Sequence, residues 1–146
     1  MHIKIGECIL LQKWDEVEFV ERHLPVFEKN KKILCSFDGM RYPIAEARIG
    51  SFDKIAITFF NSDKIHYICK IPISSIIRYG IPPKNKWDLI PEHYFEDGTL
   101  KPQKNWFLIT DIKKVDLKLN LFGLCDPPGY PPALRPSHQY IQKNFS

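Results

Sequence analysis

The sequence has little glycine, and no apolar run in it is long enough to cross a membrane. Only 7 of its 146 residues are glycine, which predicts few flexible linkers. A transmembrane helix needs about 20 consecutive apolar residues, and the apolar segments of this chain are much shorter. No secretory signal pattern is found either. We therefore expect a single domain over residues 1–146, located in the cytoplasm and without a membrane partner.

The spaced motifs of metal centres and of common enzymes are also missing. The cysteines form no C-x-x-C pair and the histidines show neither H-x-x-x-H nor H-x-E spacing, so we predict no metal and no other cofactor. There is no G-x-S-x-G, no phosphate-binding glycine loop and no Cys–His signature. The cysteines are interpreted as reduced, mostly buried thiols of a cytosolic protein: Cys8, Cys35, Cys69 and Cys125.

What the chain does have is aromatic side chains, proline and a small excess of positive charge. Aromatic residues make up 13% of the sequence and 12 residues are proline, a composition that favours short strands and shaped loops over helices. The formal net charge is +4. This excess permits a polyanionic partner, although surplus lysine also serves solubility.

The segment 104–122, KNWFLITDIKKVDLKLNLF, carries the clearest strand pattern. It opens with Trp106 and Phe107 and then alternates between apolar and polar residues. Successive side chains of a strand point to opposite faces, so this period of two predicts one long or bent strand at a core boundary. Its apolar face is expected to carry Leu117, Leu119 and Leu121, and its polar face Lys118 and Asn120.

A helix is predicted over residues 15–24. Acidic residues come first and basic residues last, which matches the helix macrodipole. Val17, Val20 and Leu24 lie at helical spacing and predict its buried stripe. Pro25 is expected to end the helix, because proline has no backbone N–H to continue the hydrogen bonding.

Short strands and tight turns dominate the rest. Residues 33–73 are interpreted as a four-stranded antiparallel meander with turns at residues 38–39 and 61–63. The other expected elements are a strand at 3–11, helical turns at 74–80, within 87–98 and at 137–145, and a stiff loop at 126–136. This order predicts an α+β fold: a compact, strongly curved antiparallel or mixed sheet, or a partly open barrel, with short flanking helices.

Two of these segments resemble the PUA-like superfamily, nearest to its EVE branch and the related YTH domains. Trp106, Phe107, Asp111 and Ile112 take the places of a W-aromatic-x-x-x-D-V strand in that branch. Residues 44–50, IAEARIG, are similar to its x-G-x-A-E-V strand but lack the glycine before alanine. The resemblance covers the central and C-terminal two-thirds of the chain. It implies a small PUA-like β-barrel with helices around it, and an aromatic pocket for a flipped, often modified, base. Related domains recognise DNA in modification-dependent restriction systems.

A base pocket requires flat walls, because stacking a base on an aromatic ring contributes roughly 1–3 kcal/mol, and polar groups that read the base edge. Trp87 is the best wall, since it follows a stiff basic loop, PPKNK. Filling the core is the alternative role for each of these aromatic residues. The expected base-pocket residues are Trp87, Trp106, Trp14, Tyr79 and Asp111.

Basic residues interleaved with prolines and aromatics can follow a phosphate backbone, and a solvated surface is the alternative for any single lysine. Arg135 stands out because it lies between Leu134 and Pro136, where its guanidinium would be fixed. The expected backbone contacts are Lys84, Lys86, Lys104, Lys31, Lys32, Arg135 and His138. The expected partner is nucleic acid, DNA before RNA, with the chain acting alone or beside a motor or nuclease subunit.

Two other functions remain open at this point. Asp97, Asp111 and Lys113 fit the PD-(D/E)xK pattern of Mg²⁺-dependent nucleases, in which carboxylates hold the metal and the lysine assists water. The D-x-K triplet is common by chance. A protein-interaction domain without nucleic-acid binding is the third hypothesis. The leading hypothesis is a non-catalytic module that recognises a modified base in an aromatic pocket with a basic rim.

Overall fold

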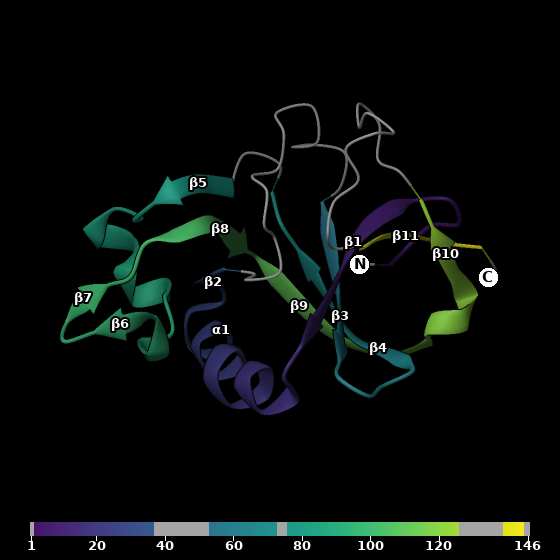
Figure 1. Cartoon of the computed structure of the whole chain (residues 1–146), viewed down its shortest axis with the longest axis horizontal. Helices are drawn as coiled ribbons and strands as arrows, with labels where there is room; N and C mark the ends of the chain where they lie inside the picture. The colour runs from purple at the N-terminus through teal and green to yellow at the C-terminus, as the bar shows by residue number, and fades with distance from the viewer. Residues whose placement is uncertain (1, 37–52, 73–75, 126–138, 145–146) are drawn as a thin grey trace.

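The computed structural model describes residues 2–36, 53–72, 76–125 and 139–144, and its main element is a curved six-stranded sheet (Figure 1). The strand order is β10-β11-β1-β3-β4-β9. The strands β1 and β3 are parallel, and the other neighbours are antiparallel. The bounds are β1 Cys8–Trp14, β3 Lys54–Phe59, β4 Lys64–Lys70, β9 Asp111–Lys118, β10 Phe122–Leu124 and β11 Gln139–Lys143.

The sheet curls because its two outermost strands are consecutive in the chain. A single turn of 3₁₀ helix, η5 (Leu119–Leu121), joins β9 to β10. So short a connection holds the two edges within reach of each other, and the sheet closes into a half-barrel. The prediction of a strongly curved, mixed sheet with short helices is confirmed.

A second sheet and a small hairpin complete the β structure. The second sheet has the order β2-β8-β5, and the hairpin pairs β6 with β7. Figure 1 shows this hairpin at one end of the molecule and β10 and β11 at the other. The bounds are β2 Ile33–Cys35, β5 Ile76–Gly80, β6 Phe95–Glu96, β7 Thr99–Leu100 and β8 Gln103–Ile109.

The two faces of the six-stranded sheet bury separate apolar clusters. Leu10 faces the larger cluster, which the second sheet and the helix cover, whereas Ile9 and Leu11 face the smaller cluster on the opposite side. This follows from the alternation of side chains along a strand. Leu117 packs against the smaller cluster, as the alternation predicted. Leu119 also packs there, but Leu119 and Leu121 lie in η5, so the predicted strand alternation does not extend to them.

The helix differs from its prediction in length and in its buried face. A π-helical stretch, η1 (Glu18–His23), continues directly into α1 (Leu24–Asn30). Pro25 lies in the first turn of α1, where a missing N–H is tolerated, so the expectation that it ends the helix was wrong. The i→i+5 bonding of a π turn shifts the buried face. Phe19 and His23 are buried, whereas Val17 and Val20 are exposed.

Several predicted elements differ in the structure, either in their strand partners or in their secondary structure. Residues 33–73 are no single meander, because β2 pairs with β8 and β3 pairs with β1; the expected return strand lies outside the described residues. Segment 104–122 is not one strand: it is divided at Thr110 between β8 and β9, which belong to different sheets, and after β9 it passes through η5 into β10. The expected helical turns at 74–80 and 137–145 are the strands β5 and β11 where the structure describes them, because each finds a neighbouring strand to pair with.

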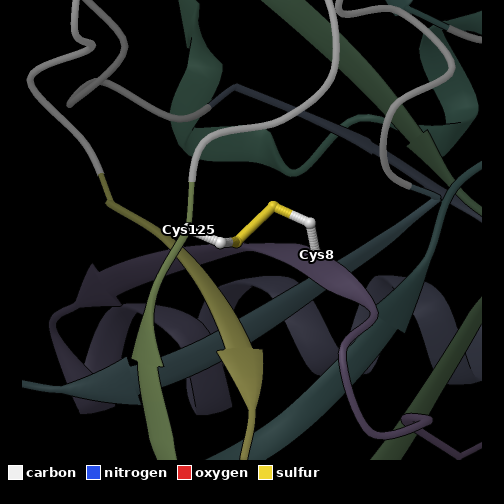
Figure 2. Close-up of a disulfide and its surroundings, with 2 residues drawn as sticks. All are labelled: Cys8 and Cys125. Carbon is white, nitrogen blue, oxygen red and sulfur yellow. A yellow bond between two sulfur atoms is a disulfide. The ribbon is translucent and has the colours of Figure 1, made fainter. Parts of the chain in front are cut away.

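A disulfide joins the start of β1 to the end of β10, as Figure 2 shows. The Cα atoms of Cys8 and Cys125 are 6.4 Å apart, within the range for a bridge, and 117 positions separate them in sequence. The prediction of four reduced thiols was therefore wrong for this pair. Cys35 and Cys69 are free and fully buried, and burial raises the pKa of both thiols. No helix among the described residues is long and apolar enough to span a bilayer.

Candidate nucleic-acid interface

Lys31 and Lys32 mark the point where the chain turns from helix into sheet. Lys31 has a left-handed backbone, with φ of 60°, and its N–H donates to the Phe27 carbonyl, which closes the last turn of α1. Ile33 follows at once and is buried in β2. Both lysine side chains are therefore held at the surface, where they are exposed.

The second basic segment is the 3₁₀ helix η3 (Lys84–Leu89), which follows two extended prolines. Its Trp87 is half-buried, and the indole Nε1 donates a 2.8 Å hydrogen bond to the Pro82 carbonyl. The ring meets Phe95 edge-on at 5.5 Å, and Lys84 Nζ lies 5.7 Å from the ring centroid. Lys84 and Lys86 are exposed. The tryptophan is thus fixed beside two lysines, with part of its surface in solvent.

One side chain brings these two segments together. Asn30 Nδ2 donates to the Val26 carbonyl at 3.1 Å within α1 and to the Asp88 carbonyl at 3.3 Å in η3. Because Lys31 and Lys32 follow Asn30, and Lys84 and Lys86 precede Asp88, these four lysines flank one bridge; we call them the basic cluster. Within the described part of the chain, none of the four forms an ion pair.

The predicted pocket tryptophans do not converge. Trp106 is 0% exposed, its Nε1 donates to the Gly80 carbonyl at 3.0 Å, and its ring lies 5.2 Å from Tyr94. An indole buried on all sides has no face left on which a base can stack, so Trp106 fills the core. Trp14 is half-buried and packs 4.5 Å from the His23 ring, whereas Trp87 contacts a different aromatic residue.

Of the remaining predicted residues, the structure describes only the side chain of Asp111. Tyr79 and Lys104 have their backbones in β5 and β8, and their side chains lie outside the described part. Arg135 and His138 lie outside the described residues altogether. Asp111 is exposed at the start of β9, opposite Lys70 on β4.

The residues of the nuclease hypothesis lie on different elements. Asp97 is in the turn between β6 and β7, with a left-handed φ of 51°, whereas Asp111 and Lys113 are on β9 in another sheet. Among the described residues, no group of three or more His, Cys, Asp and Glu side chains is placed to hold a metal ion.

Sequence reasoning missed a buried histidine–tyrosine pair. His23 is 1% exposed; its Nδ1 lies 3.0 Å from the Glu18 carbonyl and its Nε2 lies 3.0 Å from the Tyr94 hydroxyl. Burial lowers the pKa of His23 to about 4, so the ring is neutral at pH 7. A neutral ring that donates from Nδ1 accepts at Nε2, and the Tyr94 oxygen also accepts from the Ser36 N–H at 3.1 Å. No local motif signals this pair, because its members are 71 positions apart.

Beside this pair lies a pocket of about 400 Å³. It opens between the helix and η4, a 3₁₀ turn (Glu92–Tyr94) that follows η3. His93 packs edge-on against His23 at 4.9 Å, and its Nε2 lies 3.4 Å from the Glu18 carboxylate. The lining residues are Glu21, Arg22, Pro25, Val26, Glu92 and His93.

The basic cluster and the pocket beside His23 are the two surfaces from which a function can be argued. No protein-family model matches this chain, and comparisons with curated proteins and with solved structures find no match either.

Proposed function

We propose that this chain is a non-catalytic nucleic-acid-binding module that holds a phosphate backbone on the basic cluster beside Trp87. The observation that carries the proposal is the Asn30–Asp88 bridge, which places two separately predicted basic segments side by side. Among the described residues these four lysines have no ion-pair partner, so no ion pair has to break before they contact phosphate. A PUA-like assignment, a preference for DNA and a modified base as the target belong to the same proposal.

Trp87 supplies the second element of such a surface. An aromatic ring next to lysines offers a stacking platform, and stacking one base contributes roughly 1–3 kcal/mol. Its Nε1 is engaged by the Pro82 carbonyl, so the ring is already fixed in place before a base arrives. Lys84, which now lies over the ring, can move to a phosphate while a base takes its position.

The test is a tryptophan-fluorescence titration with single- and double-stranded DNA and RNA, with and without methylated or hydroxymethylated bases, over a salt series and without divalent metal. Four phosphate contacts on a single strand predict a slope of about −3 for log K against log salt. Replacing Lys31, Lys32, Lys84 and Lys86 together by glutamine should flatten this slope, and Trp87→Phe should weaken the quenching.

The chain offers a matched control. Four other lysines are exposed on β4 and β9, namely Lys70, Lys113, Lys114 and Lys118, and replacing them removes the same charge from another surface. If both quadruple variants bind equally well, the basic cluster is not the binding surface. If no oligonucleotide binds at low salt, nucleic-acid binding itself is disproved.

A cytoplasmic location is part of the proposal, and the Cys8–Cys125 disulfide is the observation that opposes it. Structural disulfides persist in oxidising compartments, and cytosolic thiols are usually kept reduced. Alkylating whole cells lysed directly into denaturant with the alkylating reagent distinguishes the two states. Four modified cysteines are expected for a reduced cytoplasmic chain, and two would place the protein in an oxidising compartment.

A further inference from the structure

The pocket between the helix and η4 has the size and the walls of a small-ligand site. Ligand pockets in proteins commonly measure about 300–1,000 Å³, and this one measures about 400 Å³. Pro25 and Val26 give it an apolar side, and charged groups of both signs complete it. An apolar side with hydrogen-bond donors and acceptors near it can orient a small polar molecule.

The walls of the pocket are held in place by the protein itself. Glu21 and Arg22 belong to the π-helical stretch η1, a rare geometry that is frequent at functional sites. The hydrogen bond between His23 and Tyr94 ties η1 to η4, so the two sides of the pocket cannot separate without breaking a buried bond. The pocket is therefore preorganised, which lowers the entropy cost of binding.

The pocket and the basic cluster share the helix as a common support. Val26 and Asn30 are four residues apart within α1, and residues at this spacing are neighbours on the surface of an α-helix. Arg22 and Val26 line the pocket, and Asn30 makes the bridge to η3. On the other side, η4 follows η3 along the chain. A strand whose phosphates lie on the basic cluster would thus have the pocket next to it.

The polar groups of the pocket select among bases. The guanidinium of Arg22 only donates hydrogen bonds, and the carboxylates of Glu21 and Glu92 only accept them. Guanine presents two adjacent acceptors, O6 and N7, which arginine recognises with two hydrogen bonds. It also presents two adjacent donors, N1–H and the N2 amino group, which match the two oxygens of one carboxylate. Thymine and uracil have one N–H between two carbonyls, so a carboxylate repels them.

We infer that this pocket accepts an unpaired guanine of a strand bound to the basic cluster, with Arg22 on its O6/N7 edge and a glutamate on its N1–H and amino group. The inference rests on the proposed function, since the strand must first be held by the four lysines. It replaces the cavity between tryptophans, which the buried Trp106 rules out, with a cavity built from charged groups and the His93 ring.

The test measures fluorescence anisotropy with four labelled strands of oligothymidylate. Three carry one central guanine, cytosine or adenine, and the fourth is unsubstituted. The wild-type protein should bind the guanine strand about tenfold more tightly than the unsubstituted strand. Glu92→Gln should lose this preference and keep its affinity for plain oligothymidylate, because glutamine offers a donor where guanine also donates. Glu28→Gln, which removes an exposed charge from α1 away from the pocket, should keep the preference.

The outcomes separate the two proposals. Salt-dependent binding of all four strands with equal affinity overturns the guanine pocket and leaves the binding function standing. A guanine preference that survives both Glu92→Gln and Glu21→Gln also overturns the pocket. Absence of binding to every strand overturns both proposals together. Because Glu21 and Glu92 are exposed, these variants are expected to fold like the wild type.

Discussion

Reduction of the Cys8–Cys125 disulfide should lower the free energy of unfolding by about 5 kcal/mol. A bridge stabilises a protein chiefly by restricting its unfolded chain, and the effect grows with the length of the loop that it closes. Here the two cysteines are 117 positions apart. The chain-entropy relation then gives about 16 cal/mol/K, which is about 5 kcal/mol at room temperature. The total free energy of unfolding of a domain of this size is roughly 5–15 kcal/mol, so the loss is large.

Guanidinium chloride unfolding with and without a phosphine reductant measures this loss. With a slope of about 4 kcal/mol per molar denaturant, the midpoint should fall by about 1 M on reduction. The double variant Cys8→Ser, Cys125→Ser should unfold at the reduced midpoint in both buffers. Cys35→Ala should remain sensitive to the reductant, because its thiol is free in the core.

Counting thiols checks the premise of this prediction. The unfolded, non-reduced protein should show two reactive thiols, from Cys35 and Cys69, and the folded protein should show almost none because both are buried. Equal midpoints with and without reductant would refute the stabilising role of the bridge. Four thiols in the unfolded, non-reduced protein would refute the bridge itself.

Two further predictions concern the His23–Tyr94 pair. Burial lowers the pKa of His23 from 6.5 in the unfolded chain to about 4 in the folded protein. Between pH 6.5 and pH 4 the unfolded chain therefore binds a proton that the folded protein does not. The free energy of unfolding should drop by about 3 kcal/mol as the pH falls through this range. Denaturant unfolding at a series of pH values measures this drop. The drop should be absent in His23→Gln and present in His66→Gln. An unchanged drop in His23→Gln would contradict the assignment. Tyr94→Phe removes the hydroxyl that meets His23 Nε2 and the Ser36 N–H, at a cost of about 1–3 kcal/mol in denaturant unfolding, whereas Tyr67→Phe should cost below about 0.5 kcal/mol. Equal effects of the two tyrosine variants would show that the hydroxyl of Tyr94 is dispensable.

Patterns that depend on neighbouring residues were predictable. The turn at residues 61–63 joins β3 to β4 as expected, and Asn61 takes the left-handed conformation that such a turn requires. The alternation at the end of β9 placed Leu117 inward and Lys118 outward. Each of these depends only on the local backbone and on the sheet face that meets the core.

Pairing between distant segments was not predictable in the same way. A helical turn was predicted at residues 74–80, yet residues 76–80 form β5 because β8 offers them backbone partners. A helical turn was also predicted at residues 137–145, yet residues 139–143 form β11, which pairs with β1 and β10. Backbone hydrogen bonds to a neighbouring strand outweigh the weak preference of a short segment for helix.

By itself, the sequence determined that most lysines are exposed, that strand residues alternate between core and solvent and that the elements are short. Charge and hydrophobicity decide locally whether a side chain can leave water. Only the tertiary structure decided that Lys31 and Lys84 flank one bridge, that Trp106 rather than Trp87 fills the core, and that His23 meets Tyr94. It also decided that Cys8 pairs with Cys125. These contacts join residues that are far apart in the chain, and their energy depends on a geometry that exists only once the two sheets and the helix have packed together.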